Sequence, residues 1–384
     1  MHNIFCVLIL FALVISGCSP AAASTPTETA ESTAIPELLA SPASQSAMPS
    51  QVPAATEKIN SSLFQFHEGN PVLPHRARPN WDSQFIDPGG MVYHDGQFHM
   101  FFNGISRFPA PVGVGYATSS DGFEWTRQSE EPVLSAEAMN GTNLLGSNLF
   151  VTSALVEPDG TWVLYFYTLG DAGFNGAGEI GRATAPAPTG PWTLNPEPVL
   201  SPGPNGAWDD VQVAGPNVLK SGDTYLMYYD AAGDGSQSMI GMATSMDGVQ
   251  WEKYNDPATE DQAFAESDPV LEVSSEGWDS KRVIDPNVIS TPDGFEMIYL
   301  ATSGSGKFAP GEFAFGLATS TDGIQWTKSG LNPLLTNKDY SWWKQAYLAS
   351  LLHVDETYYL YFDAVASGSG GTDVYLATYD GSLK

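Results

Sequence analysis

The feature that most constrains the fold of this chain is a long internal repeat. A Pro-Val-Leu or Pro-Leu-Leu tripeptide recurs at spacings of 61, 66, 71 and 64 residues, beginning at Pro71, Pro132, Pro198, Pro269 and Pro333. An Ala-Thr pair follows each tripeptide, at Ala117, Ala183, Ala243, Ala318 and Ala377. Self-similarity at a fixed long period is typical of repeat architectures, in which each unit packs on its neighbours.

Each repeat reads as a series of short strands. Alternating or continuous apolar runs such as residues 97–102 and 224–229 have the length of strands, and Asp-Gly pairs mark the tight turns between them. Four strands fit within each repeat. The sequence therefore predicts an all-β fold, a five-bladed β-propeller of four-stranded antiparallel blades over residues 61–384.

The two ends of the repeat region predict how the ring closes. Only residues 379–384 follow the last Ala-Thr pair, too few for a full outer strand. At the other end, Leu63–Phe66 precede Pro71 much as Gln325–Thr327 precede Pro333. We expect this N-terminal segment to supply the missing outer strand of the fifth blade, because closure removes an unpaired sheet edge.

Three of the repeats share a Ser-x-Asp-Gly-x-x-Trp segment after the Ala-Thr pair. It begins at Ser119, Ser245 and Ser320. The segment resembles a shortened form of the Asp-box of sialidases, in which the Asp braces a turn and the Trp packs between blades. The resemblance implies a structural role for these residues.

The first residues have the pattern of an export signal. Ile4 to Ile15 is an apolar run too short to span a bilayer but long enough for the core of a signal peptide. It leads into Ile15-Ser16-Gly17-Cys18, which resembles the lipobox of bacterial lipoproteins. The resemblance implies a signal peptide over residues 1–18 and lipidation of Cys18, with localisation at the cell surface or in the periplasm. The alternative is an ordinary cleaved secretory signal.

Residues 19–60 have the composition of a disordered tether. They are rich in Ala, Ser, Thr and Pro, contain no aromatic residue and show no apolar period. The other cysteine, Cys6, lies in the segment expected to be removed. The mature domain would then depend on packing rather than on disulfides.

Composition restricts the partners of the domain. The formal net charge of −29 argues against nucleic acid and anionic membrane surfaces, which bind basic proteins. The histidines show no metal-ligand spacing, and we expect no transition metal and no cofactor. The alternative is a calcium or sodium ion on the axis, which the sequence does not decide. We predict a monomer that reaches the membrane through its lipid anchor alone and binds carbohydrate.

Candidate catalytic residues gather where the innermost strands are expected to begin. Asp87 and Asp285 each stand before a proline at that point in blades one and four. We expect both side chains to face one central funnel, where paired carboxylates could act as acid and as base or nucleophile on a glycosidic bond. The alternative is that either Asp caps a turn.

The stretch from Phe85 to Phe102 resembles the first blade of the five-bladed glycoside hydrolases. These include the invertase and levansucrase group (families 32 and 68) and the arabinanase and xylosidase group (family 43). The resemblance implies that Asp87 is the nucleophile or general base.

The family pattern is incomplete elsewhere. Where the arabinanase group has Glu-Gly-Pro as its acid, this chain has Ala214-Gly215-Pro216, and it has no Glu-Cys motif. Candidates for a replacement acid are Asp210, Glu179 and Glu312.

Candidate substrate-binding residues lie around the same strand starts. Indole rings stack on sugar C–H surfaces, and basic side chains could bind a carboxylated or phosphorylated sugar. The aromatic and acidic candidates are Trp81, Trp208, Asp209, Trp278, Asp279, Trp342 and Trp343, and the basic ones are Arg76, Arg78, Arg107 and Arg282, with Lys281, Lys307 and Lys344 nearby. The alternatives are that the tryptophans pack between blades and that the basic residues neutralise the acidic ones.

The sequence thus predicts an extracellular glycoside hydrolase acting on an oligosaccharide or polysaccharide. A glycan-binding surface lipoprotein without catalysis and a protein-interaction propeller are the two alternatives.

Overall fold

The computed structural model describes residues 63–107, 110–169, 178–233, 237–259, 261–304, 313–337, 344–365 and 370–383. All of these residues belong to the unit Val52–Lys384. The predicted signal peptide, the tether and Cys18 lie outside the described residues. Within those residues, no helix has both the length and the apolar character needed to cross a bilayer.

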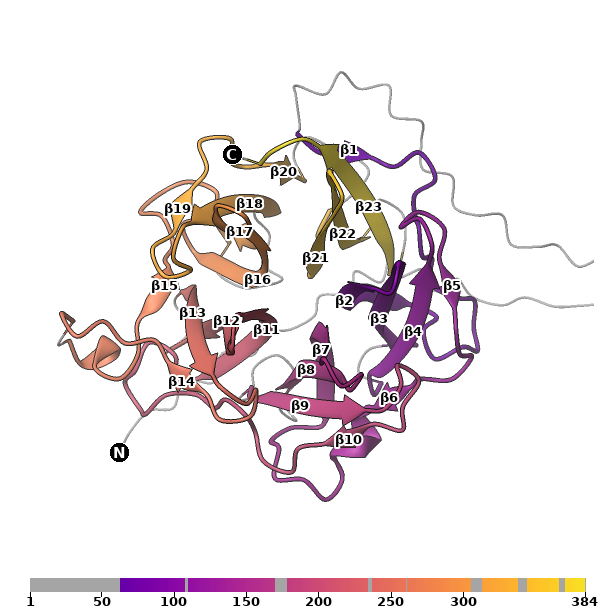
Figure 1. Ribbon diagram of the computed structural model, residues 1–384, viewed down its shortest axis with the longest axis horizontal. Coiled ribbons are helices and arrows are strands. Elements are labelled where there is room, and N and C mark those ends of the chain that lie inside the picture. The colour runs from indigo at the N-terminus through magenta and orange to yellow at the C-terminus, as the bar shows by residue number, and fades with distance from the viewer. Residues whose placement is uncertain are drawn as a thin grey trace, which may run out of the picture. The chain divides into compact units, whose positions relative to one another are not determined.

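The described part of the chain is all-β. We group its strands by chain order into five sets, called blades one to five, which lie around a common centre (Figure 1). By hydrogen bonding they form four sheets, because blades three and four share one ten-stranded sheet. Blade one contains β2 (Phe85–His94), β3 (Gln97–Ile105), β4 (Gly113–Ser119), β5 (Thr126–Arg127) and β6 (Leu134–Ser135). Blade two contains β7 (Asn148–Val156), β8 (Trp162–Leu169), β9 (Ile180–Ala185) and β10 (Thr193–Leu194).

The later blades repeat this order. Blade three contains β11 (Gln212–Ser221), β12 (Thr224–Ala232), β13 (Ser238–Ser245), β14 (Glu252–Lys253) and β15 (Pro269–Leu271). Blade four contains β16 (Arg282–Thr291), β17 (Gly294–Thr302), β18 (Phe313–Ser320), β19 (Thr327–Lys328) and β20 (Leu335–Thr336). Blade five contains β21 (Ala349–Val354), β22 (Thr357–Val365) and β23 (Thr372–Asp380). Two short 3-10 helices, Ala136–Met139 and Gln262–Phe264, lie between strands.

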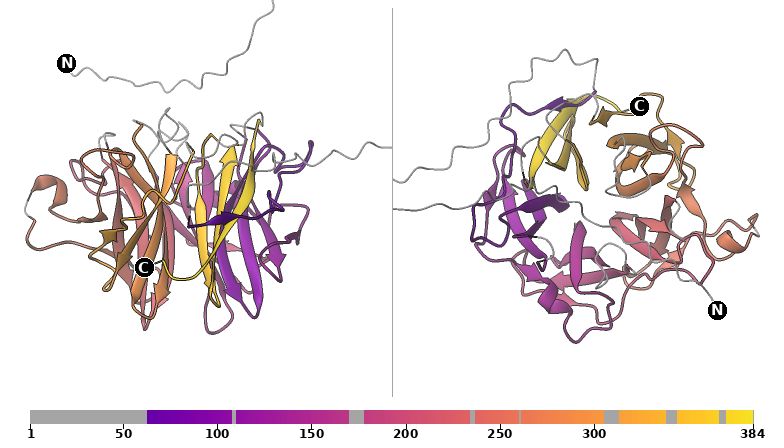
Figure 2. Two further views of the ribbon diagram at one scale, coloured as in Figure 1. Left: turned by 90° about the horizontal axis from the view of Figure 1, so that it is seen from above. Right: turned by 180° about the vertical axis from the view of Figure 1, so that it is seen from behind.

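The first strand of each blade lies nearest the centre, as the labels in Figure 1 show, and Figure 2 gives the view from behind. Neighbouring first strands contact one another in order, β2 with β7, β7 with β11, β11 with β16 and β16 with β21. β21 in turn contacts β2. Within a blade, successive long strands pair antiparallel, as expected for strands joined by tight turns.

The N-terminal strand belongs to the last blade. β1 (Gln65–Phe66) pairs antiparallel with β23, with Gln65 opposite Thr378 and Phe66 opposite Ala377. The side chain of Phe64 is fully buried in an apolar cluster that includes residues of blades four and five. Residues more than 300 positions apart in sequence therefore share one core.

The Ser-x-Asp-Gly-x-x-Trp turns have the structural role that the sequence predicts. Asp121 Oδ1 accepts hydrogen bonds from the backbone N–H groups of Phe123 and Glu124 at 2.8 and 3.0 Å. Trp125 in the same turn meets Tyr361 of blade five edge-on, with ring centroids 5.6 Å apart. The Tyr361 hydroxyl donates to the carbonyl of Gly122 at 2.7 Å. A turn of blade one is thus fastened to a strand of blade five.

The same contact recurs at two other junctions between blades. Tyr165 of blade two meets Trp251 and donates to Gly248 O, and Tyr228 of blade three meets Trp326 and donates to Gly323 O. Burial raises the pKa of both tyrosines, so both remain protonated donors at neutral pH. The repeat in sequence is therefore a repeat of contacts between blades.

Replacing Phe64 tests how much the N-terminal segment contributes to stability. Phe64→Ala should lower the free energy of unfolding by about 3–5 kcal/mol, because it leaves a cavity in a packed core. Chemical denaturation of purified protein measures this. Leu331→Ala, at a side chain that is mostly exposed, is the control and should change stability by less than about 0.5 kcal/mol. Equal stability of the two variants would contradict the packing described for Phe64.

Candidate active site

The first strands of three blades begin with the same backbone irregularity. β2 bulges between Asp87 and Gly90, β11 between Ala214 and Asn217, and β16 between Ile284 and Asn287. Each bulge has one residue with positive φ, namely Gly89, Gly215 and Asp285. Bulges re-aim side chains at the rims of sheets, and these three lie at the same end of their blades.

The register of these strands separates the two aspartates that the sequence aligned. Asp87 stands opposite Asn103 on β3, and the residue in the matching place on β16 is Ile284, opposite Leu300. Asp285 is one residue further along and occupies the place of Gly215 in blade three. The two Asp-Pro pairs are therefore alike in sequence but not in position.

Asp87 is half-buried, and two donors hold Oδ1 of its carboxylate. Oδ1 accepts a hydrogen bond from Asn103 Nδ2 at 2.7 Å and another from the backbone N–H of Gly89 at 3.1 Å. Gly89 has φ +50°, and a Cβ there would lie 1.9 Å from the carbonyl oxygen of Phe101. Only glycine fits this turn, and the turn fixes the direction of the Asp87 side chain.

Asp285 is buried beside a second carboxylate, that of Asp230 on β12. The backbone N–H of Asp285 donates to Asp230 Oδ1 at 3.2 Å. A Cβ on Gly215 would lie 2.5 Å from Asp230 Oδ1 and 3.2 Å from Asp285 Oδ1, so both carboxylates border this glycine. Burial lowers the pKa of nearby Arg282, and the charge of Asp230 opposes that change.

Sequence reasoning missed both Asn103 and Asp230. Each is the seventh residue of the second strand of its blade, in Phe102-Asn103-Gly104 and Tyr229-Asp230-Ala231. The available signal was a polar residue at this place of an otherwise apolar second strand, which recurs in four of the five blades. Its importance depends on cross-strand register, which places Asn103 opposite Asp87 and Asp230 opposite Ala214.

Two of the other acid candidates make local contacts. Asp210 Oδ2 accepts from the backbone N–H of Gly206 at 2.6 Å. Glu179 is buried, and its two oxygens accept from the backbone N–H of Leu145 and the hydroxyl of Ser201 at 3.0 and 3.2 Å. These contacts brace loops. Glu312, Lys307, Trp342 and Trp343 lie outside the described residues.

The aspartates of the three Trp-Asp pairs form buried ion pairs within their blades. Asp209 Oδ2 lies 2.6 Å from Lys253 Nζ on β14, and Asp279 Oδ2 lies 2.7 Å from Lys328 Nζ on β19. Asp82 binds Arg127 of β5 in the same way, with Nε 3.1 Å from Oδ2. In each case the ion pair joins the loop before the first strand to the outer strand of the same blade.

The tryptophans of these pairs stack on aromatic rings of the same blade. Trp81 stacks on Phe102, Trp208 on Tyr229 and Trp278 on Tyr299, with centroids 5.7, 6.4 and 5.9 Å apart. Trp208 is buried, and its Nε1–H donates to Ser267. The structure thus gives each proposed sugar-binding Trp-Asp pair an internal partner. A second role in sugar binding stays a prediction for the partly exposed Trp81 and Trp278.

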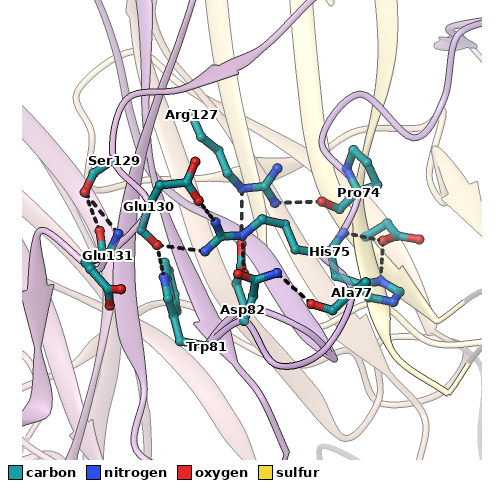
Figure 3. Close-up of polar contacts among 12 residues, drawn as sticks. Pro74, His75, Ala77, Trp81, Asp82, Arg127, Ser129, Glu130 and Glu131 are labelled. Atoms are coloured by element: carbon teal, nitrogen blue, oxygen red, sulfur yellow. Dashed lines mark hydrogen bonds and ion pairs between the residues drawn. The ribbon is translucent and has the colours of Figure 1, made fainter. Parts of the chain in front are cut away.

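Figure 3 shows the network of blade one around Asp82, Arg127 and Glu130, and Arg76 bonds to two of these residues. Its Nε lies 2.7 Å from Asp82 Oδ1, and its other nitrogens bind the side chain and the carbonyl of Glu130. Neighbouring His75 bonds to Asp373 of β23 at 2.6 Å, which raises the pKa of His75. Arg78 and Arg107 are exposed. Of the basic candidates, Arg76 is ion-paired with Asp82 and Glu130, and Arg282 lies beside the Asp230–Asp285 pair.

Comparison with known proteins places this site in a family. The family model described as the glycosyl hydrolases family 32 N-terminal domain matches residues 80–287, more than half of the chain and the region that contains Asp87 and Asp285. The chain belongs to this family. The predicted relationship to the five-bladed propeller glycoside hydrolases is confirmed. No curated protein sequence matches the chain.

Solved structures show the same fold in other glycoside hydrolases. A candidate glycoside hydrolase from Parabacteroides distasonis is 17% identical, with a TM-score of 0.62 over 84% of this chain and 98% of that one. A glycosyl hydrolase from Bacteroides ovatus is 17% identical, with a TM-score of 0.60 over 83% and 93%. A thermostable family-43 glycoside hydrolase is 15% identical, with a TM-score of 0.58 over 78% and 91%. At these identities the likeness concerns the propeller fold.

Replacing Asp209 separates its structural contact from a role in sugar binding. Asp209→Asn should lower the free energy of unfolding by about 3–5 kcal/mol, because it leaves the largely buried Lys253 ammonium without its charge partner. Denaturant titration measures the change. Glu252→Gln, on the exposed neighbour of Lys253, should change stability by less than about 0.5 kcal/mol. Unchanged stability with weakened glycan binding would instead make Asp209 a ligand of the sugar.

Proposed function

We propose that this chain is an extracellular glycoside hydrolase that cleaves an oligosaccharide or polysaccharide, with Asp87 as nucleophile or general base. The observation behind the proposal is the way in which Asp87 is held. Asp87 is only half-buried where a first strand begins, and two donors fix its Oδ1. A catalyst needs this combination of access and fixed orientation.

We further propose that the fold is a five-bladed propeller closed by β1. The pairing of β1 with β23 and the contact of β21 with β2 support closure. Closure matters for the site, because Thr372 of β23 bonds to both backbone groups of Ile86, the residue before Asp87. The last blade therefore helps to hold the candidate catalyst in the first.

The proposed reaction needs a second carboxyl group as the acid. We propose that Asp285 supplies this carboxyl group, with Asp230 as its neighbour. The leaving oxygen takes a proton from the acid and keeps the electron pair of the broken bond to the anomeric carbon. The new bond to that carbon comes from the Asp87 carboxylate or from a water that Asp87 deprotonates. Arg282 beside the pair would also suit an acidic sugar.

One observation favours a second candidate function, glycan binding without cleavage. The first strand of blade three has Ala214 at the place of Asp87, and its own bulge has no ionisable side chain. The residue opposite Ala214 on the neighbouring strand is Asp230, which does carry a carboxylate. A propeller that had lost its acid would keep the sugar-binding surface alone.

The charge of Asp87 is the decisive test. Asp87→Asn keeps the size of the side chain but removes its basicity, and it should lower the rate of glycan hydrolysis by at least about 10²–10⁴-fold. The measurement is reducing-sugar release from a panel of glycans, with binding followed by calorimetry. Asp95→Asn, at the exposed turn of the same hairpin, is the matched control and should keep the wild-type rate.

Two results would change the proposal. If wild type cleaves a glycan and Asp87→Asn cleaves it equally fast, Asp87 is not part of the mechanism. If wild type binds glycans but releases no sugar from any of them, the function is glycan binding.

We also propose that the domain is held at the outer face of a membrane through lipidated Cys18. Cys18→Ala should leave the protein unprocessed or release it from the membrane fraction, because the residue that takes the lipid is gone. Fractionation followed by gel mobility measures both outcomes. Cys6→Ala should behave as wild type, since Cys6 lies in the segment that processing removes. Wild-type mobility and fractionation of Cys18→Ala would contradict the lipoprotein proposal.

A further inference from the structure

Asn103 is a buried amide that joins two blades. It lies on β3, is 1% exposed, and faces the backbone of Val151 on β7. Its Oδ1 accepts from the N–H of Val151 at 2.8 Å, and its Nδ2 donates to the carbonyl of Val151 at 2.8 Å. The side chain thus pairs with both polar groups of one residue of the neighbouring first strand.

This pairing fixes which way the amide points. If the amide were turned over, its NH₂ would meet the N–H of Val151 and its oxygen would meet the carbonyl, leaving buried polar groups unpaired. The second hydrogen of Nδ2 is therefore held in one direction, and Asp87 Oδ1 lies there at 2.7 Å. Both N–H groups of the Asn103 amide and one acceptor site of its oxygen therefore have partners.

The turn that bears Asp87 is fixed from the other side as well. The hydroxyl of Ser350 on β21 donates to the carbonyl of Gly89 at 2.6 Å, and the N–H of Gly89 donates to Asp87 Oδ1. A Cβ on Gly89 would also lie 3.2 Å from the carbonyl oxygen of Val151. Blades two and five together leave the Asp87 turn little freedom.

We propose that Asn103 is the positioning residue of Asp87, and that it keeps this carboxylate charged and oriented through a hydrogen bond that blade two holds in place. A donor to a carboxylate favours the charged form, which is the form that a nucleophile or general base needs. The catalytic consequence rests on the function proposed above. The hydrogen bond and its effect on the charge of Asp87 are independent of that function.

The titration of Asp87 tests the proposal directly. Protein labelled with ¹³C at the carboxyl carbons of aspartate is titrated by NMR, and the Asp87 signal is assigned by its absence from Asp87→Asn. In Asn103→Ala the titration midpoint of Asp87 should move to higher pH by about one to two units, because a hydrogen bond to the charged form is lost. Asn103→Asp keeps the acceptor for Val151 N–H and should move the midpoint in the same direction, since two carboxyls then face each other.

Asn217 supplies a matched control. Its Oδ1 accepts from the backbone N–H of Val288 at 2.9 Å, so it joins blade three to blade four as Asn103 joins blade one to blade two. Asn217→Ala should weaken the fold to a similar degree and leave the Asp87 midpoint unchanged. A midpoint within about 0.3 units of wild type in both Asn103 variants, or an equal shift in Asn217→Ala, would overturn the proposal and leave Asn103 a structural residue.

The two proposals fail in different ways. If wild type cleaves a glycan, the acid limb of its kcat/KM profile should move in the Asn103 variants by the same amount as the NMR midpoint. If wild type cleaves none, the function proposed above is wrong, and the titration alone still decides whether Asn103 controls the charge of Asp87.

Discussion

The structure depends on the contact between neighbouring blades, because no single blade can bury both of its faces. At three junctions a buried tyrosine of one blade donates to a glycine carbonyl in the Ser-x-Asp-Gly turn of the next, and the tryptophan of that turn meets the tyrosine ring edge-on. One of these contacts joins blade five to blade one through Tyr361 and Gly122. The junctions convert a sequence repeat into a common core.

Side chains that bond to the first strand of the next blade extend the same principle to the centre. Asn103 binds Val151, Asn217 binds Val288, and Asn287 binds Leu351, each across a junction between blades. Asp87 lies next to the first of these contacts. Precision at the candidate catalyst therefore comes from junctions between blades rather than from a single strand, which is how a scaffold of separate sheets can hold a side chain rigidly.

The Trp-Asp pairs show where reasoning from sequence reached its limit. They stand near the starts of first strands, as the sequence indicates, and from that position they were candidates for binding sugar. Their partners are Arg127, Lys253 and Lys328, each two residues after the Trp of a Ser-x-Asp-Gly turn. A buried charge needs a partner, and that partner lies about 45 residues away in sequence, on the outer strand.

The sequence by itself determined the repeat, the strands, the turns and the family, because each depends on residues a few positions apart or on one long repeat period. It also placed Asp87 at the start of a first strand. Only the tertiary structure decided that Asp285 is out of register with Asp87, and that Asn103 and Asp230 border the site. Those relations depend on cross-strand register and on single-residue bulges, where one inserted residue changes the direction in which a side chain points.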